Sequence, residues 1–174
     1  MFRRFLYDLY DYLVEIAPIA LIALGLFLLV VGPGCARADT WSSLGGVSHH
    51  FNRSTPHNEE NFGYGFETDT GIPHLRVIGG QYKNSFWRRT FYAGASYTPW
   101  ALGPVQLGFQ AAALTGYGSD TCDDTGHCSY HERLTVFGVP MAQIEGKHFG
   151  VNALIAPSLS HKGGVVALQF KVKF

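Results

Sequence analysis

The sequence predicts an all-β protein, an eight-stranded antiparallel transmembrane β-barrel preceded by an N-terminal signal or anchor helix. Three observations lead to this fold. After residue 38, apolar and polar residues alternate with a period of two in eight short segments, no stretch keeps a long helical period, and short connections alternate with longer polar ones. Each segment has roughly the 9 to 11 residues that a tilted transmembrane strand needs.

We expect strands at 41–52, 61–69, 74–82, 90–98, 104–115, 134–145, 148–156 and 164–174. The last segment carries the clearest pattern, with Leu168 and Phe170 on one face and Gln169 and Lys171 on the other. In a soluble sheet the apolar face would form the core, whereas in an outer-membrane barrel it faces lipid and the polar face fills the lumen. No predicted helix is available to cover a sheet, which favours the membrane interpretation.

The connections divide into two sets by length. Those at 70–73, 99–103 and 146–147 are tight, and those at 53–60, 83–89, 116–133 and 157–163 are longer and polar. Outer-membrane barrels have short periplasmic turns and longer external loops. The longer set is therefore predicted to lie outside, which places His50 and Ser85 at one external rim.

The N-terminus carries an export signal. Arg3 and Arg4 precede an apolar run at 16–31, and a small-x-small cleavage site ends at Ala38. This divides the chain into a signal peptide at 1–38 and a barrel domain at 39–174. An uncleaved anchor remains open, because acidic residues precede the apolar run.

Composition narrows the function classes. The 13 basic and 13 acidic side chains balance, and the basic residues form no stripe, which excludes nucleic acid as a partner. Cys122 and Cys128 lie in a Gly/Asp/Ser-rich stretch of an exported chain, which predicts a disulfide. A zinc site with His127 and His131 is the alternative, but the spacing matches no standard ligand pattern, so we expect no metal.

Ser85 and His50 are the candidate reactive residues. A serine becomes a nucleophile when a base takes its proton, and histidine is the side chain best suited to do so near neutral pH. Ser85 follows Lys83 and Asn84 in a polar break between two predicted strands. The adjacent His49 points to the opposite face of an extended strand, although one β-bulge would exchange the two histidines.

Several separated motifs resemble one family. His57-Asn58-Glu59 leads into Gly63-Tyr64-Gly65, Lys83-Asn84-Ser85-Phe86 follows a strand, and Ala93-Gly94 lies nine residues after the serine. From His50 to Phe174 the chain resembles the lipid A palmitoyltransferase family of outer-membrane enzymes, often called PagP. Its motifs are Tyr-Asn-Glu, Lys-Asp-Ser-Trp and Ala-Gly at corresponding spacings, and Pro140 and Pro157 match two of its prolines.

The resemblance implies an acyltransferase in the outer membrane of a Gram-negative cell. Such an enzyme moves a palmitoyl chain from a phospholipid donor to lipid A, and it needs no cofactor. His50 then resembles the catalytic histidine and Ser85 the serine, and Asn84 stands where the family has an aspartate. We expect a monomer.

The resemblance also implies an acyl-chain route. Proline cannot donate a ladder hydrogen bond, so Pro140 and Pro157 on neighbouring strands are expected to flank a lateral gate. Ser96 aligns with the family's glycine floor of the acyl pocket, and with Gly94 it would face inward. A serine floor predicts a slightly shorter acyl chain.

Two departures from the family keep other functions open. Asn84 carries no charge to stabilise an imidazolium, so Glu59 or Glu67 would have to replace the aspartate. Only Asp39 and Thr40 separate the predicted cleavage site from Trp41, so the amphipathic helix that precedes the family's first strand is either missing or replaced by a retained N-terminal segment. A non-catalytic outer-membrane barrel acting at the cell surface is therefore the alternative, and a lipid A deacylase is a third candidate.

Overall fold

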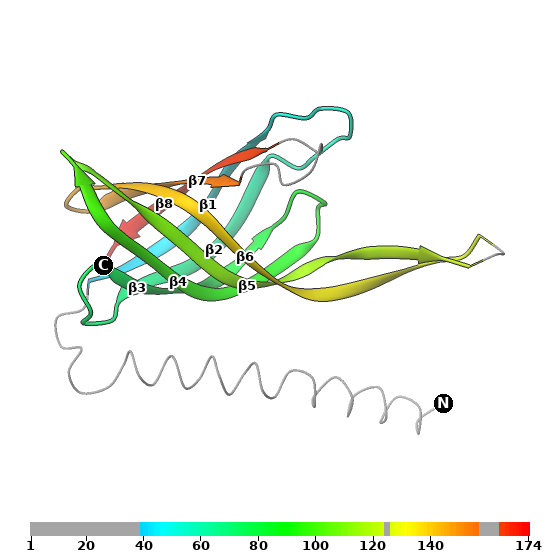
Figure 1. The fold of residues 1–174 in the computed structure, drawn as a ribbon, viewed down its shortest axis with the longest axis horizontal. Coiled ribbons are helices and arrows are strands. Elements are labelled where there is room, and N and C mark those ends of the chain that lie inside the picture. The colour runs from blue at the N-terminus through cyan, green and yellow to red at the C-terminus, as the bar shows by residue number, and fades with distance from the viewer. Residues whose placement is uncertain (1–38, 124–125, 157–163) are drawn as a thin grey trace, which may run out of the picture. The chain divides into compact units, whose positions relative to one another are not determined.

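A computed structural model describes residues 39–123, 126–156 and 164–174, which form eight strands and no helix. The strands are β1 Thr40–His50, β2 Glu60–Asp69, β3 Leu75–Lys83, β4 Arg89–Leu102, β5 Val105–Cys122, β6 Cys128–Glu145, β7 Phe149–Ala156 and β8 Val165–Lys173. Each strand pairs antiparallel with the next and β8 pairs with β1, so the sheet closes into a ring (Figure 1). The predicted signal at 1–38 and Pro157 lie outside the described residues.

The period-two pattern determines which side chains enter the ring. On β8, Leu168 and Phe170 are 38% and 47% exposed, whereas the next residue, Lys171, is 1% exposed. On β2, Phe62 is exposed and Glu67 is buried in the same way. Because successive side chains of a strand point to opposite faces, the apolar residues lie outside and the polar ones inside. The predicted inward and outward faces of β8 are confirmed, and β2 follows the same pattern.

The outer surface is apolar around most of the ring. Every strand except β3 carries large exposed apolar side chains, among them Leu44, Phe62, Phe91, Phe109, Val136, Phe149 and Phe170. Soluble monomers rarely expose contiguous apolar patches of more than a few hundred Å². No helix in the described part of the chain is long and apolar enough to cross a membrane.

The connection predicted at 116–133 is a strand pair, which corrects that part of the sequence prediction. β5 and β6 continue beyond the ring as a hairpin, paired from Tyr117 with Arg133 to Cys122 with Cys128 (Figure 1). The predicted disulfide between Cys122 and Cys128 forms at the tip of this hairpin. Two strands that pair with each other satisfy their backbone hydrogen bonds without needing an apolar face. The Gly/Asp/Ser-rich segment therefore lacks the apolar–polar alternation by which the other strands were predicted.

The turn predicted at 99–103 is also shorter than expected. β4 continues to Leu102 after an irregularity between Tyr97 and Trp100, and the chain reverses at Gly103 with a positive φ of 60°. A left-handed residue is accessible to glycine at little steric cost. A bulge of this kind adds a residue and bends the strand, which the simple alternation did not reveal.

One seam in the ring is only partly paired. β6 pairs with β7 from Met141 with Leu154 to Glu145 with Gly150, and in the described residues Pro140 and the rest of β6 toward its start have no β7 partner. The same part of β6 is paired with β5 throughout. Pro140 therefore stands where the β6–β7 ladder ends, as expected for a residue that cannot donate to it.

Candidate active site

His50 and Ser85 meet at the end of the ring that carries the longer connections. His50 is the last residue of β1, and Ser85 lies 35 residues later in the short turn between β3 and β4. The Nε2 atom of His50 is 2.9 Å from the Oγ atom of Ser85. The β1–β2 connection fixes the turn, because the Asn58 backbone N–H donates to the Ser85 carbonyl at 2.9 Å. The sequence prediction paired these two residues, and the structure brings them into hydrogen-bond contact.

His50, not His49, is the inward-facing histidine. The His50 side chain is 13% exposed and the His49 side chain 52%. The imidazole of His57 stacks on that of His50, with ring centroids 4.2 Å apart. Sequence reasoning named His57 only as part of a motif, because nothing in the strand pattern predicts a contact from within a loop.

Glu59 is the carboxylate that accompanies His50. Its Oε1 atom accepts the backbone N–H of His50 at 3.0 Å and lies 3.9 Å from His50 Nδ1. The hydrogen bond from the His50 backbone, together with the nearby Arg53 guanidinium, lowers the pKa of Glu59. The carboxylate therefore stays ionised where a histidine titrates. His50 Nδ1 is buried and has no hydrogen-bond partner, so Glu59 acts on it through its charge.

This arrangement determines how His50 can act. For Nε2 to accept a proton from Ser85, the ring proton must be on Nδ1. The resulting imidazolium would then have an anion on its Nδ1 side. Glu67, the other candidate for this role, lies elsewhere in the lumen, where it contacts Lys171 and Arg76.

Asn84 is a structural residue of the turn. It is fully buried, and its amide makes four hydrogen bonds. The nitrogen donates to Thr90 Oγ1 and the Gly116 carbonyl, and the oxygen accepts the backbone N–H groups of Phe86 and Arg88. These bonds use both donors and both acceptor positions of the amide, so Asn84 positions the turn and does not bond His50. The catalytic role that the family's aspartate implies for position 84 therefore stays a prediction, and none of these four contacts involves His50.

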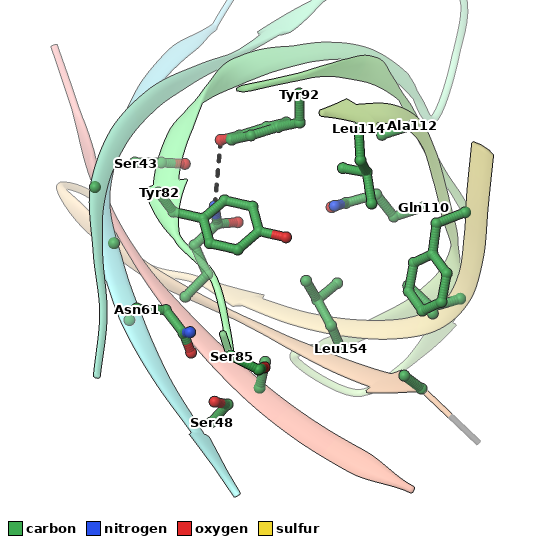
Figure 2. A pocket seen from close by; sticks show the side chains of 18 of the residues that line it. Ser43, Ser48, Asn61, Tyr82, Ser85, Tyr92, Gln110, Ala112, Leu114 and Leu154 are labelled. Atoms are coloured by element: carbon green, nitrogen blue, oxygen red, sulfur yellow. Dashed lines mark hydrogen bonds between the residues drawn. The ribbon is translucent and has the colours of Figure 1, made fainter. Parts of the chain in front are cut away.

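A cavity of about 190 Å³ extends into the ring from Ser85 (Figure 2). Its walls combine aliphatic residues such as Leu114, Val139 and Leu154 with the rings of Tyr82 and Tyr117. Val139 and Leu154 belong to β6 and β7, next to the partly paired seam. The cavity therefore borders the seam and Ser85, which His50 contacts.

The far end of the cavity is lined by Tyr92, Gln110 and Gln169. Gln169 donates to the Tyr92 hydroxyl at 3.5 Å (Figure 2), and a Cβ atom on Gly65 would come within 2.3 Å of that hydroxyl. Ser96 is buried on the inward face of β4, but neither it nor Gly94 is among the lining residues. Tyr92 thus occupies the end of the cavity that alignment with the family gives to Ser96.

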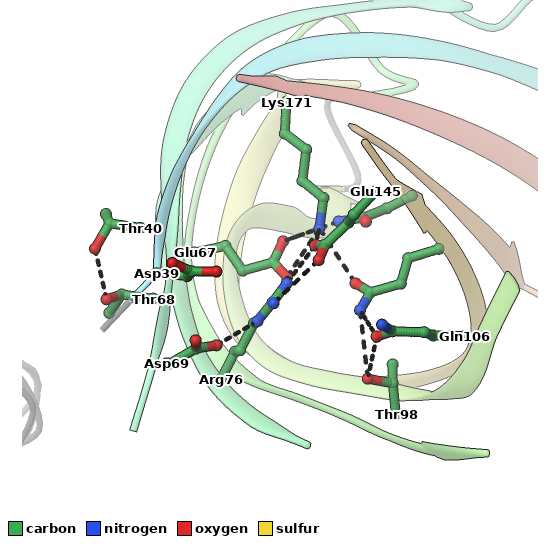
Figure 3. A network of polar contacts seen from close by, with 12 residues as sticks. Asp39, Thr40, Glu67, Thr68, Asp69, Arg76, Thr98, Gln106, Glu145 and Lys171 are labelled. Atoms are coloured by element: carbon green, nitrogen blue, oxygen red, sulfur yellow. Dashed lines mark hydrogen bonds and ion pairs between the residues drawn. The ribbon is translucent and has the colours of Figure 1, made fainter. Parts of the chain in front are cut away.

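On the side of the cavity away from Ser85, the lumen contains four charged residues that pair with one another (Figure 3). We call them the lumen ion cluster: Glu67, Arg76, Glu145 and Lys171. Lys171 Nζ is 3.0 Å from Glu67 Oε1, and Arg76 Nη1 is 2.9 Å from the same atom. Asn152 joins this cluster to the cavity by donating to Glu67 and to Gln169. Buried charges are tolerated only when they are paired, and here each charge contacts at least two of the opposite sign.

Within the described residues, no group of three His, Cys, Asp or Glu side chains is arranged to hold a metal ion. No family model matches the chain. No curated protein matches it either.

Proposed function

We propose that this protein is an outer-membrane acyltransferase that moves a palmitoyl chain, or one of similar length, from a phospholipid to lipid A. The observation that carries the proposal is the 2.9 Å contact between His50 and Ser85 beside a largely apolar cavity. A hydroxyl next to a base is what acyl transfer requires, and an apolar cavity suits an acyl chain. The resemblance of the chain to lipid A palmitoyltransferases names the two lipids.

The membrane location rests on the inverted distribution of polarity. The ring buries Glu67, Lys171 and Gln143 and exposes aromatic and aliphatic side chains around its outside. A bilayer removes that outer surface from contact with water, while the lumen satisfies the polar groups. The longer connections then face the outside of the cell, where lipid A is available.

The proposed reaction exchanges one ester for another. In one route Ser85 Oγ attacks the donor ester carbonyl and its proton passes to His50 Nε2. The bond between the acyl carbon and the glycerol oxygen then breaks as that proton moves to the departing glycerol oxygen, which leaves an acyl-serine. The acceptor hydroxyl then gives its proton to His50, attacks the acyl-serine and returns Ser85 to its starting state. In a second route Ser85 donates a hydrogen bond to the carbonyl oxygen while His50 activates the acceptor hydroxyl directly.

The β6–β7 seam is the proposed entry for the acyl chain. From Pro140 back toward its start, β6 has no β7 partner among the described residues, and Val139 and Leu154 line the cavity beside that gap. A chain entering there would pass from the bilayer into the cavity without crossing water. Pro140 keeps the seam from closing, because it cannot donate the missing ladder bond.

Expression in a Gram-negative host that lacks its own palmitoyltransferase tests the proposal. Mass spectrometry of lipid A should show an added acyl chain that disappears in Ser85→Ala and His50→Ala, with each variant present in the outer membrane. Loss of an existing acyl chain would instead identify a deacylase. An unchanged spectrum from the folded wild type would refute both enzymatic functions.

One observation favours a non-catalytic surface barrel as the second candidate. His50 Nδ1 has no hydrogen-bond partner, and the position where the family has an aspartate is used to hold the turn. A decayed site would keep the fold and the hairpin of β5 and β6 while losing the orientation of the histidine. The same lipid A spectrum separates this candidate from the enzyme.

A further inference from the structure

The turn that carries Ser85 concentrates unpaired positive charge. Lys83, Arg88 and Arg89 fall within seven residues, and residues 70–119 contain no aspartate or glutamate. In the described part of the chain none of these three cations forms an ion pair, whereas Arg76 and Lys171 in the lumen do. The Glu132 carboxylate on β6 lies near the turn, where it accepts the Gly116 N–H, but it forms no ion pair with these cations. Cations without an ion-pair partner are the usual mark of a surface that meets an anionic partner.

The strand register places two of these charges side by side. Lys83 on β3 lies directly opposite Arg89 on β4. Their neighbours Tyr82 and Thr90 are directed to the inside, Tyr82 in the cavity wall and Thr90 fully buried. Since side chains alternate along a strand, Lys83 and Arg89 share the outward face. Like charges directly opposite each other repel, and an anion bound between them removes that repulsion.

Arg88 completes the group from the tip of the turn. Its guanidinium lies 3.4 Å from the centroid of the Tyr130 ring on β6. Stacking on an aromatic face fixes the plane of a guanidinium and leaves its N–H edge available for a bidentate contact with phosphate.

Two aromatic side chains project from the same turn. Phe86 is 56% exposed and Trp87 is 51% exposed, and Trp87 has a positive φ of 60°. A left-handed conformation is uncommon for a bulky residue and persists only where the surroundings impose it. Asn84 imposes it here, because its buried oxygen accepts the N–H groups on both sides of Trp87. Exposed aromatic rings flanked by cations are typical of segments that sit at the membrane–water interface.

We propose that the turn from Lys83 to Arg89 binds the phosphate of an anionic lipid headgroup. Lys83, Arg88 and Arg89 contact the phosphate, and Phe86 and Trp87 enter the interface beside it. The proposal rests on the membrane location given above and adds a substrate class to the same site. Ser85 lies in the middle of the turn, so the bound lipid is held with its headgroup next to the reacting hydroxyl.

Fluorescence quenching by brominated lipids tests this site without requiring catalysis. The full chain carries Trp100→Phe, which leaves Trp87 as the exposed tryptophan because Trp41 is buried. It is placed in phosphatidylcholine nanodiscs that contain the same fraction of either brominated phosphatidylglycerol or brominated phosphatidylcholine. We expect stronger quenching by the anionic lipid, and roughly a fivefold loss of that preference for each cation replaced by glutamine.

Two controls make the result specific. Lys147→Gln, an exposed cation in the β6–β7 turn, should keep the preference. Inorganic phosphate at matched ionic strength should leave it unchanged. Equal quenching by both lipids, retention of the preference in the Lys83→Gln/Arg88→Gln/Arg89→Gln variant, or its removal by inorganic phosphate would each overturn the lipid site. A preference without any change in lipid A would leave this site standing while the proposed transferase falls.

Discussion

The two ends of the lumen use buried polar residues in opposite ways. At the end of the ring that carries the β2–β3, β4–β5 and β6–β7 turns (the turn end), the lumen ion cluster fills the ring with charges that pair with one another. At the opposite end, which carries the longer connections (the loop end), Ser85 borders a cavity. His50 Nδ1 is buried there without a hydrogen-bond partner, as Trp41 Nε1 and Asn152 Oδ1 are elsewhere in the ring. Polar networks in which every group has a partner stabilise a fold. Buried polar atoms that lack a hydrogen-bond partner beside a cavity are more typical of catalytic or ligand-binding sites. We therefore propose that the turn end serves stability and the loop end the chemistry.

The largest expected effect is the loss of acyl transfer on replacement of His50 at the loop end. His50→Ala should lower acyl transfer about 10²–10⁴-fold, the usual contribution of a general base. His49→Ala is the matched control, because the His49 side chain is half exposed and the hydrogen bond to Ser85 comes from His50. Transfer rates in detergent micelles measure both variants. Equal effects of the two substitutions would show that His50 has no special role.

At the turn end, Glu67→Gln should act on stability and spare the chemistry. The substitution leaves Lys171 and Arg76 with less buried counter-charge, and breaking a buried ion pair costs about 3–5 kcal/mol. Glu60→Gln, at the exposed start of the same strand, should change the free energy of unfolding by less than about 0.5 kcal/mol. Urea unfolding in lipid vesicles measures the difference. Similar unfolding energies for the two variants would remove the cluster from the account of stability.

Asn84→Asp distinguishes a structural turn residue from a weakened catalytic one. Because the family has an aspartate at this position, the resemblance alone would lead us to expect that the carboxylate raises activity. The structure reverses this expectation, because an aspartate would face the Gly116 carbonyl without a donor, at a cost of about 1–3 kcal/mol. Asn52→Asp is the control, since the Asn52 side chain only accepts a hydrogen bond, from Ser54. A gain in turnover for Asn84→Asp would contradict the structural role.

Glu59→Gln tests the electrostatic support of His50. The amide can keep the bond to the His50 backbone but loses the charge that favours the imidazolium. We expect a roughly tenfold lower rate, and an acidic limb of the pH–rate profile that moves to lower pH because burial lowers the pKa of His50, whereas the Glu59 charge raises it. Glu60→Gln should leave the profile in place. An unshifted profile for Glu59→Gln would argue that the carboxylate only holds the loop.

The smallest expected effect concerns acyl-chain length. Tyr92 lines the far end of the cavity and Ser96 does not. Tyr92→Leu should therefore lengthen the preferred chain by about one or two methylenes, whereas Ser96→Gly should leave it unchanged. The masses of acylated lipid A report the chain length. A shift caused by Ser96→Gly alone would restore the floor that alignment with the family suggests.

Periodicity was sufficient to predict the architecture. Alternation along segments such as 164–174 identified the strands and their inward faces, and the two lengths of connection placed His50 and Ser85 at the same end. The hairpin beyond Gly116 was missed because paired strands without an apolar face carry no alternation signal. The fold was thus predictable wherever one face of a strand differed from the other.

The details of the site depended on contacts that sequence does not encode locally. Glu59 and Glu67 were equivalent candidates until the structure placed one beside His50 and the other beside Lys171. Asn84 resembled a catalytic position, yet its amide is saturated by the turn around it. Such assignments depend on tertiary geometry at the level of single hydrogen bonds, which spacing along the chain cannot determine.

The central claim is that the His50–Ser85 pair transfers an acyl chain held in the adjacent cavity. The most direct test supplies the purified protein in mixed micelles with lipid A and a phospholipid labelled in its acyl chain, and follows the label by chromatography. The account predicts labelled lipid A from the wild type and from His49→Ala, and none above background from Ser85→Ala or His50→Ala. Label that stays on the phospholipid with the folded wild type, or appears only as free fatty acid, would contradict it.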